Sequence, residues 1–304
     1  MTAWICVTCG TQVAPTDHPP AVCPICQDQR QHVGREGQQW TTLDQMASGG
    51  FRNDIAEQEA GLIEIHTTPT FAIGQRALVL RTSAGNVLWD CVSFLDEATI
   101  DAVRHGGGIQ VIAISHPHYY TTMVEWAERF DARIVLHAAD RRWVMRGSDR
   151  VTFWDGDAHA LMDGVTLVRA GGHFPGGTIL HWRDGADGRG ALLTGDIIDV
   201  VADRRWVSFM YSYPNLIPLP AVEVRRIGET VGRYRFDRIY GAWVGSTVAP
   251  DARGAVARSV ERYITALDTG LSDADGSVAR PPARGAGEVG TGLDLAQDRG
   301  GGAA

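Results

Sequence analysis

The feature that most constrains this chain is a pair of histidines that directly follows an apolar segment. Residues 109–114 read Ile-Gln-Val-Ile-Ala-Ile, which predicts a buried strand, and the next residues, Ser-His-Pro-His-Tyr-Tyr-Thr, contain His116 and His118. Side chains two residues apart on a strand lie on the same face, so both imidazoles can point at one metal ion. Pro117 stiffens the segment between them. On this stretch alone, two surface histidines in a turn are the alternative.

Two later segments also place a possible ligand after a predicted strand. The strand expected at residues 165–169 ends in Gly-Gly-His-Phe-Pro-Gly-Gly, where small neighbours let His173 approach a metal or ligand closely. The hairpin expected at residues 178–182 and 191–194 ends in Gly-Asp, so Asp196 also follows a strand. Three imidazoles and a carboxylate are ligand types that suit zinc or iron.

The remaining pattern predicts a mixed α/β chain. Residues 109–137 show the strand, helix and strand of a βαβ unit, and Thr122 and Glu125 have the spacing of a capping box at the start of that helix. Residues 210–219, rich in Tyr and Pro, are expected to form either a loop beside the substrate or a packed crossover. Further strands are expected at residues 62–66, 76–81, 87–91 and 236–243, and further helices at residues 95–104, 221–234 and 252–267.

Residues 1–38 contain four of the five cysteines as two C-x-x-C pairs, Cys6 with Cys9 and Cys23 with Cys26. Two such pairs form a closed tetrahedral thiolate site that suits structural Zn²⁺. The segment resembles a zinc ribbon or a rubredoxin, and its short stretch between the pairs favours zinc over iron. Metal binding is expected to supply most of its folding free energy.

Composition limits the location and the partners of the chain. The net charge of −8 gives no reason to expect general nucleic-acid binding, and it favours a small-molecule substrate, with the ribbon as a possible contact for a protein partner. No apolar run approaches the roughly 20 residues that span a bilayer, so no membrane association is expected. A secretory signal is not visible, which predicts a cytoplasmic protein.

In their order and spacing, His116, His118, His173 and Asp196 resemble the metallo-β-lactamase fold superfamily over roughly residues 60–265. Asp90 matches that family's early strand-end aspartate, and the glycine-rich sequence around His173 resembles its Gly-His-Thr-x-Gly-Ser loop. The resemblance implies an α/β fold, an αββα sandwich whose metals lie on loops after strands. The expected organisation is a zinc ribbon at residues 1–38, a connector at 39–60, the metallo-β-lactamase-like domain at 61–269 and a disordered tail at 270–304.

The sequence departs from the family's metal motif. That motif normally reads His-x-His-x-Asp-His, but Tyr120 and Thr121 occupy its last two metal-binding positions, and no histidine follows His181. The resemblance therefore implies one metal, Zn²⁺ or Fe²⁺, at His116, His118, His173 and Asp196. Asp196 and Tyr120 are the expected catalytic residues, with Tyr119 or Tyr120 either donating a hydrogen bond or filling the space of a second metal.

Three functions agree with this pattern. The first is a metal-dependent hydrolase of an ester, thioester or lactone that uses a mononuclear site. The second is a non-catalytic binding module that retains the sandwich and contacts a partner through the ribbon. The third is an Fe(II) oxidoreductase of the sulfur dioxygenase type, which the resemblance includes because some members of the superfamily have such a site.

Overall fold

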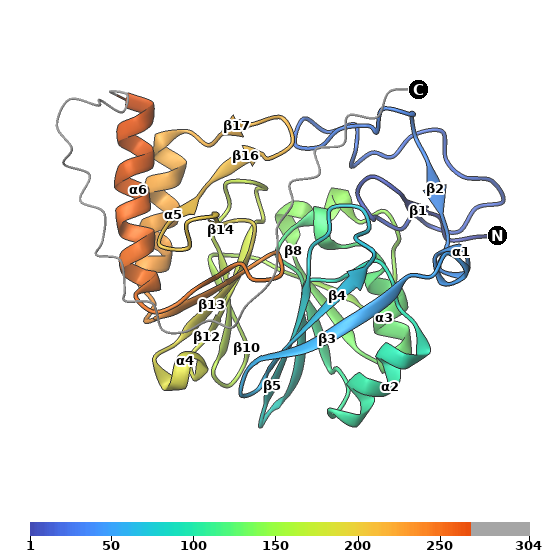
Figure 1. Cartoon of the computed structure of the whole chain (residues 1–304), viewed down its shortest axis with the longest axis horizontal. Coiled ribbons are helices and arrows are strands. Elements are labelled where there is room, and N and C mark those ends of the chain that lie inside the picture. The colour runs from blue at the N-terminus through green and yellow to red at the C-terminus, as the bar shows by residue number, and fades with distance from the viewer. Residues whose placement is uncertain (269–304) are drawn as a thin grey trace, which may run out of the picture. The chain divides into compact units, whose positions relative to one another are not determined.

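The computed structural model describes residues 1–268, and two β-sheets form its centre (Figure 1). The strands of the first sheet are, in spatial order, β3 (Arg52–Glu59), β4 (Leu62–Thr68), β5 (Ala77–Thr82), β6 (Gly85–Trp89), β7 (Val111–Ala113), β8 (Arg133–His137) and β9 (Val151–Trp154). β3 to β6 pair antiparallel, and β6 to β9 pair parallel. The parallel half confirms the expected βαβ unit.

The second sheet pairs its strands antiparallel except for one parallel pair, β13 with β18. Its strands are, in spatial order, β10 (Ala158–Met162), β11 (Val165–Arg169), β12 (Thr178–Trp182), β13 (Ala191–Gly195), β18 (Arg238–Gly241) and β19 (Thr247–Val248). The expected hairpin of β12 and β13 is thereby confirmed.

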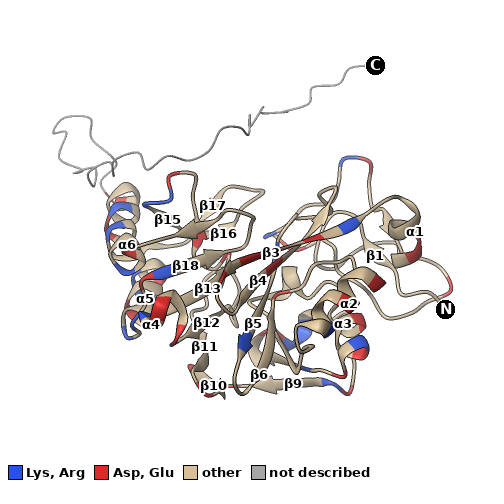
Figure 2. Cartoon of the chain, turned by 60° about the horizontal axis from the view of Figure 1, so that its bottom comes forward, with Lys and Arg blue, Asp and Glu red and all other residues tan. Residues whose placement is uncertain are grey.

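Two short helices, α1 (Leu43–Ser48) and α4 (Gly185–Gly188), lie in connections. The longer helices lie on the outer faces of the sheets (Figure 1): α2 (Glu97–His105) and α3 (Met123–Phe130) on the first sheet, and α5 (Ala221–Gly232) and α6 (Ala252–Asp268) on the second. Acidic and basic residues are interspersed on these helices (Figure 2). No helix among the described residues is long and apolar enough to cross a bilayer.

Three apolar layers hold this arrangement together. Between the sheets, side chains such as Trp89 and Val111 pack with Leu167 and Leu193 from the opposite sheet. A second cluster joins α2 and α3 to the first sheet, and a third joins α5 and α6 to the second sheet. The α/β sandwich with helices on both outer faces, an αββα arrangement, is therefore confirmed.

Short two-stranded sheets complete the described part of the chain. They are β1 (Ile5–Cys6) with β2 (Trp40–Thr41), β14 (Asp199–Val200) with β15 (Val207–Ser208), and β16 (Met210–Ser212) with β17 (Ile217–Pro218). All described residues, the cysteine segment included, belong to one compact unit.

Two local predictions were wrong. The expected connector at residues 39–60 contains β3, because the polar strand forms an edge of the first sheet and pairs only with β4. Thr122 begins α3 without a capping bond from its side chain; its hydroxyl instead donates to the carbonyls of Val92 and Ser93 at 3.2 and 3.0 Å. The expected tail at 270–304 lies outside the described residues.

A buried arginine links the two sheets. Arg76, next to β5, donates from Nε to the Gly241 carbonyl at 2.9 Å and from Nη2 to the Ser246 carbonyl at 3.0 Å, both in the β18–β19 hairpin. Its Nη1 pairs with Glu64 of β4 at 2.5 Å, and both side chains are buried. The buried charges of Arg76 and Glu64 compensate each other, so removal of either side chain leaves the other charge buried and unpaired.

Arg76→Ala is expected to lower the free energy of unfolding by about 3–5 kcal/mol, because it leaves the Glu64 carboxylate buried without its partner. Urea unfolding followed by tryptophan fluorescence measures the loss. Arg133→Ala, at an exposed position at the start of β8, is the control and should change stability by less than about 0.5 kcal/mol. Equal effects of the two substitutions would contradict the assigned role.

Candidate metal centres

The structure brings the three predicted histidines together. His116 follows β7, His118 lies in the 3₁₀ turn η1 (Pro117–Tyr119), and His173 lies in the loop between β11 and β12. The centroids of the three rings are 4.9 to 5.1 Å apart. The two histidines of the first motif do not occupy a strand face as expected, because the chain turns at Pro117; the turn brings them together instead.

The ligand-type atoms of the cluster face a common point. One nitrogen from each histidine lies within 4.8 Å of the other two, and His173 Nε2 is 3.2 Å from His118 Nδ1. Zinc–nitrogen bonds at tetrahedral angles would separate two ligating nitrogens by about 3.4 Å. The spacing of the histidines therefore fits a single metal ion.

Asp196, just after β13, lies at the side of the histidine cluster. Its Oδ1 is 3.3 Å from His116 Nε2, and neither atom has a hydrogen-bond partner within the described chain although both are buried. Buried polar atoms normally have a hydrogen-bond partner. The lack of a partner for both of these atoms favours a cation between or beside them. Asp196 is not part of the group of mutually close nitrogens, and its role as a ligand stays a prediction.

Hydrogen bonds on the outer side of the rings fix which nitrogen faces the cluster. His173 Nδ1 lies 2.8 Å from the Tyr211 carbonyl, to which it donates, so its Nε2 carries the lone pair. His116 Nδ1 lies 2.9 Å from Ser115 Oγ. Such outer contacts are typical of metal-binding histidines because they set the tautomer and the ring orientation.

Burial sets the protonation of the site. It holds the pKa of His116 and His118 well below the usual range of histidine and lowers the pKa of His173 to about 4. These imidazoles are therefore neutral near pH 7, the form that binds metals. Burial, and next the charge of Asp199, raise the pKa of Asp196 well above its usual value, whereas a nearby cation would favour the ionised carboxylate.

Tyrosines hold Asp196 on both sides. The hydroxyl of Tyr119 donates to Asp196 Oδ2 at 3.1 Å, and the hydroxyl of Tyr213 donates to the Asp196 backbone carbonyl at 2.6 Å. Both tyrosines lie in the apolar cluster that includes residues of α3, and burial, followed by Asp140, raises the pKa of Tyr120, the expected catalytic phenol. Its hydroxyl makes no hydrogen bond to the site within the described residues. The chain turns in η1, so consecutive tyrosines point in different directions, and Tyr119 is the phenol at Asp196.

The loops that carry these residues are held by close backbone contacts. Asp90 Oδ1 accepts a hydrogen bond from the backbone N–H of Ser115 at 2.7 Å, which fixes the start of the histidine motif. Gly195, at a positive φ of 54°, lies so close to Ser115 that a Cβ atom would come within 2.5 Å of its Oγ. Asp140 similarly accepts from the N–H of Gly176 at 3.0 Å in the His173 loop.

The four N-terminal cysteines form a second cluster. They are free thiols, buried and mutually close; Cys6 Sγ is 3.6 Å from Cys26 Sγ, and Cys9 Sγ is 3.7 Å from Cys23 Sγ. Tetrahedral zinc–sulfur bonds would separate two thiolates by about 3.8 Å, so the donor set fits structural zinc. The fifth cysteine, Cys91, is buried in a different apolar cluster, the one that joins α2 and α3 to the first sheet.

The cysteine segment covers the histidine cluster. Its Arg30 lies over the ring of Phe174 at 4.4 Å and over the ring of Tyr211 at 4.8 Å. Ser212 Oγ donates to the Arg30 carbonyl at 3.1 Å, and Asn215 Nδ2 donates to two neighbouring carbonyls of the segment. Residues 210–219 thus form the β16–β17 hairpin, which contacts the histidine cluster on one side and residues 29–31 of the cysteine segment on the other.

Arg30, Phe174 and Tyr211 border the site although no sequence motif identified them. Phe174 is the residue after His173, and its ring lies 4.9 to 5.5 Å from all three histidine rings. The only sequence signal for Tyr211 was the aromatic composition of residues 210–219. No sequence signal indicated Arg30, because the position of this residue depends on how the cysteine segment packs.

Metal analysis of the purified protein tests both clusters. Wild type is expected to contain about two metal equivalents per chain, one for each cluster that fits an ion. His116→Ala with His173→Ala should lower this to about one, since the cysteine cluster remains. His105→Ala with His159→Ala, two histidines outside the cluster, is the matched control and should retain both. A single equivalent in wild type, unchanged by the cluster substitutions, would contradict metal binding by the histidines.

Comparison of the sequence with known proteins identifies a relative of this chain. No protein-family model matches the chain. A Bacillus subtilis (strain 168) protein described as the uncharacterized protein YmaE is 51% identical over 272 residues, which cover 89% of this chain and 99% of YmaE.

Solved metallo-β-lactamases share the fold at low identity. DIM-1, in a crystal exposed to ceftazidime, is 12% identical with a TM-score of 0.54 and covers 70% of this chain and 98% of its own. FIM-1 from Pseudomonas aeruginosa, in a mono-zinc form, is 12% identical with a TM-score of 0.53 and covers 70% of this chain and 96% of its own. The chain therefore belongs to the family of YmaE and has the metallo-β-lactamase fold, preceded by a four-cysteine segment.

Proposed function

We propose that this protein is a metal-dependent hydrolase that uses one metal ion at His116, His118 and His173. The observation that carries the proposal is the triangle of three neutral, buried imidazoles with an uncompensated carboxylate oxygen beside it, on the metallo-β-lactamase fold. The FIM-1 structure describes a mono-zinc form, which supports the use of a single ion on this fold. Zinc is the proposed metal at both clusters.

A metal held there would supply a Lewis acid and would lower the pKa of a bound water to about 7. Asp196 accepts the hydrogen bond of Tyr119 on one oxygen, and its other oxygen faces His116. That second oxygen is positioned to ligate the ion or to take a proton from a water beside it. Esters, thioesters and lactones are the proposed substrates, because their hydrolysis needs one activated water and a polarised carbonyl.

The alternative is a non-catalytic module in which the ion is structural and the ribbon contacts a partner. One observation favours it: all three histidines are at most 3% exposed. A closed site suits a structural ion, whereas a hydrolase needs an open coordination position. The iron-dependent oxidoreductase is a third proposal, which iron in the histidine cluster would favour.

Hydrolysis of a panel of p-nitrophenyl esters, thioesters and lactones tests the proposal on metal-loaded protein. Wild type should turn over at least one class, and His116→Ala with His173→Ala should abolish that activity. If wild type holds metal in the histidine cluster but hydrolyses none of these, the hydrolase proposal fails and the structural alternative stands. Consumption of oxygen in the presence of a persulfide substrate would instead support the iron-dependent oxidoreductase.

Tyr119→Phe is expected to lower kcat about tenfold or more, because Asp196 loses the donor on Oδ2. Tyr120→Phe is the matched control, and its kcat should change less than about twofold. The ratio of the two kcat values on the best ester of the panel measures the difference. A larger effect at Tyr120 would restore the original sequence-based assignment.

A further inference from the structure

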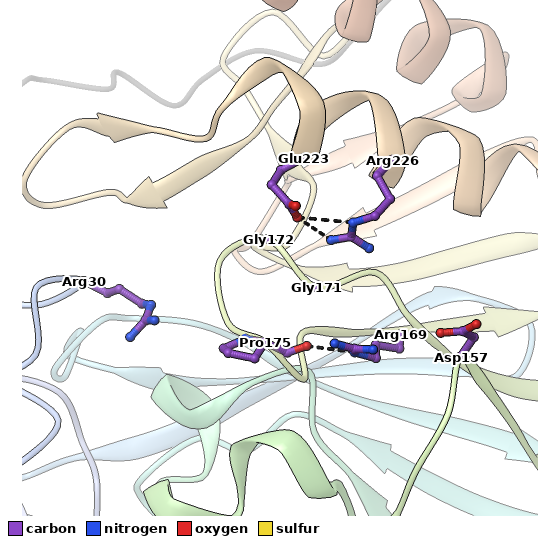
Figure 3. Close-up of a pocket in the computed structure, with 8 residues that line it drawn as sticks. All are labelled: Arg30, Asp157, Arg169, Gly171, Gly172, Pro175, Glu223 and Arg226. Atoms are coloured by element: carbon purple, nitrogen blue, oxygen red, sulfur yellow. Dashed lines mark hydrogen bonds and ion pairs between the residues drawn. The ribbon is translucent and has the colours of Figure 1, made fainter.

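A pocket of about 370 Å³ lies against the loop that carries His173 (Figure 3). Its lining comes from parts of the chain that are far apart in sequence: the cysteine segment, the start of β10, the end of β11, the glycine loop and α5. The lining residues are Arg30, Asp157, Arg169, Gly171, Gly172, Pro175, Glu223 and Arg226. Pockets of this size accommodate small organic ligands.

Arginines outnumber acidic residues in the lining of the pocket although the chain is acidic. Three arginines and two acidic residues line it, whereas the whole chain has a net charge of −8. Glu223 pairs with Arg226 at 2.5 Å, and Asp28, outside the lining, pairs with Arg30 at 2.7 Å, so Asp157 and Arg169 are the remaining charged groups of the lining. What the lining offers an anion is therefore a set of guanidinium donors.

Several arginine nitrogens in the pocket are available as donors. Arg169 uses Nε for the Pro175 carbonyl at 2.9 Å, and Arg226 uses Nε and Nη2 for Glu223. Within the described chain, the terminal nitrogens of Arg169 and the Nη1 of Arg226 make no hydrogen bond. Planar guanidinium groups with free donors bind phosphate and carboxylate oxygens in pairs.

Arg30 supplies a second, independent indication of a ligand. Its side chain is 9% exposed, it donates from Nη1 to Asp28 at 2.7 Å, and its buried Nε has no hydrogen-bond partner in the described residues. A buried guanidinium N–H without an acceptor is costly, so an incoming oxygen would satisfy it. Arg30 also stacks on Phe174, whose ring contacts all three histidines.

The glycine loop lets the arginines approach. Gly171 and Gly172 have positive φ angles of 65° and 79°, and a Cβ on Gly171 would come within 2.6 Å of Arg226 Nη2. In Figure 3, Arg30 lies on one side of this loop, and Arg169 and Arg226 lie on the other. The same short segment thus carries His173 and borders the pocket.

We propose that this pocket binds the anionic group, a phosphate or a carboxylate, of the molecule that the histidine site hydrolyses, with Arg30 between the pocket and that site. The substrate would then be an anionic ester, thioester or lactone rather than a neutral one. This inference rests on the proposed hydrolase function, which it narrows to a class of substrates.

Isothermal titration of the metal-loaded, full-length protein with inorganic phosphate and, separately, with succinate tests the pocket. Wild type should bind one of the two saturably at constant ionic strength. Arg169→Met with Arg226→Met should weaken that binding at least about tenfold, since charge-assisted hydrogen bonds are lost. Arg225→Met, an exposed neighbour on α5, is the control and should bind as wild type. Preference for phosphate or for succinate identifies the anionic group.

A second variant separates this pocket from the metal. His116→Ala with His173→Ala should still bind the anion, because the arginines remain. Loss of binding in that variant would place the anion at the metal and overturn the inference, as would equal binding by the arginine variant and wild type or no saturable binding of either anion.

Competition connects the pocket to the reaction. The preferred anion should raise the KM of a hydrolysed anionic ester without changing kcat, and the arginine variant should lose this effect while it keeps activity on neutral esters. Anion binding that depends on the arginines without any competition would overturn the role in substrate recognition. Anion binding in a protein that hydrolyses no ester would contradict the hydrolase proposal while it leaves the anion pocket itself established.

Discussion

The constraint on which the rest of the structure depends is the burial of three imidazoles and a carboxylate around one point. Polar atoms removed from water destabilise a fold unless hydrogen bonds or an ion compensate for the lost hydration. Three of these four groups are held from outside by hydrogen bonds. Ser115 contacts the His116 ring, the Tyr211 carbonyl accepts from His173, and Tyr119 donates to Asp196. His116 Nε2 and Asp196 Oδ1 keep no hydrogen-bond partner within the described residues, which is the arrangement that a cation would complete.

The cysteine segment and the sandwich form one structural unit at this site. Gln12 N donates to the Thr121 carbonyl at 3.1 Å, and Gly10 lies close to the Thr121 methyl group. Thr121 occupies the last position of the histidine motif, so the N-terminal segment packs where the resemblance would place a ligand of a second metal. Folding of the cysteine cluster around an ion would therefore also fix Arg30 and the cover of the histidine site.

The departures from the family motif have a consistent physical meaning in the structure. Tyr119 and Asp196 form a hydrogen-bonded pair beside the histidines, and Tyr120 and Thr121 are buried against the core and the N-terminal segment. The three histidines thus fit one ion, and the two motif positions that lack a ligand are buried in the protein. The glycine loop around His173, in contrast, borders a pocket lined by Arg30, Arg169 and Arg226, and the proposed anion site depends on these side chains.

Local sequence determined much of this molecule. Period-two and apolar runs predicted β4, β5, β11 and β13. The order and spacing of the ligand-type residues identified the three histidines that converge and Asp196, which lies beside His116. Such signals are local because strand alternation and ligand chemistry depend on a few neighbouring residues. The polar edge strand β3, the choice of Tyr119 over Tyr120 and the place of Arg30 depended instead on tertiary structure. Contacts between segments far apart in sequence decide each of these three features. No local sequence pattern contains the packing energy of such contacts.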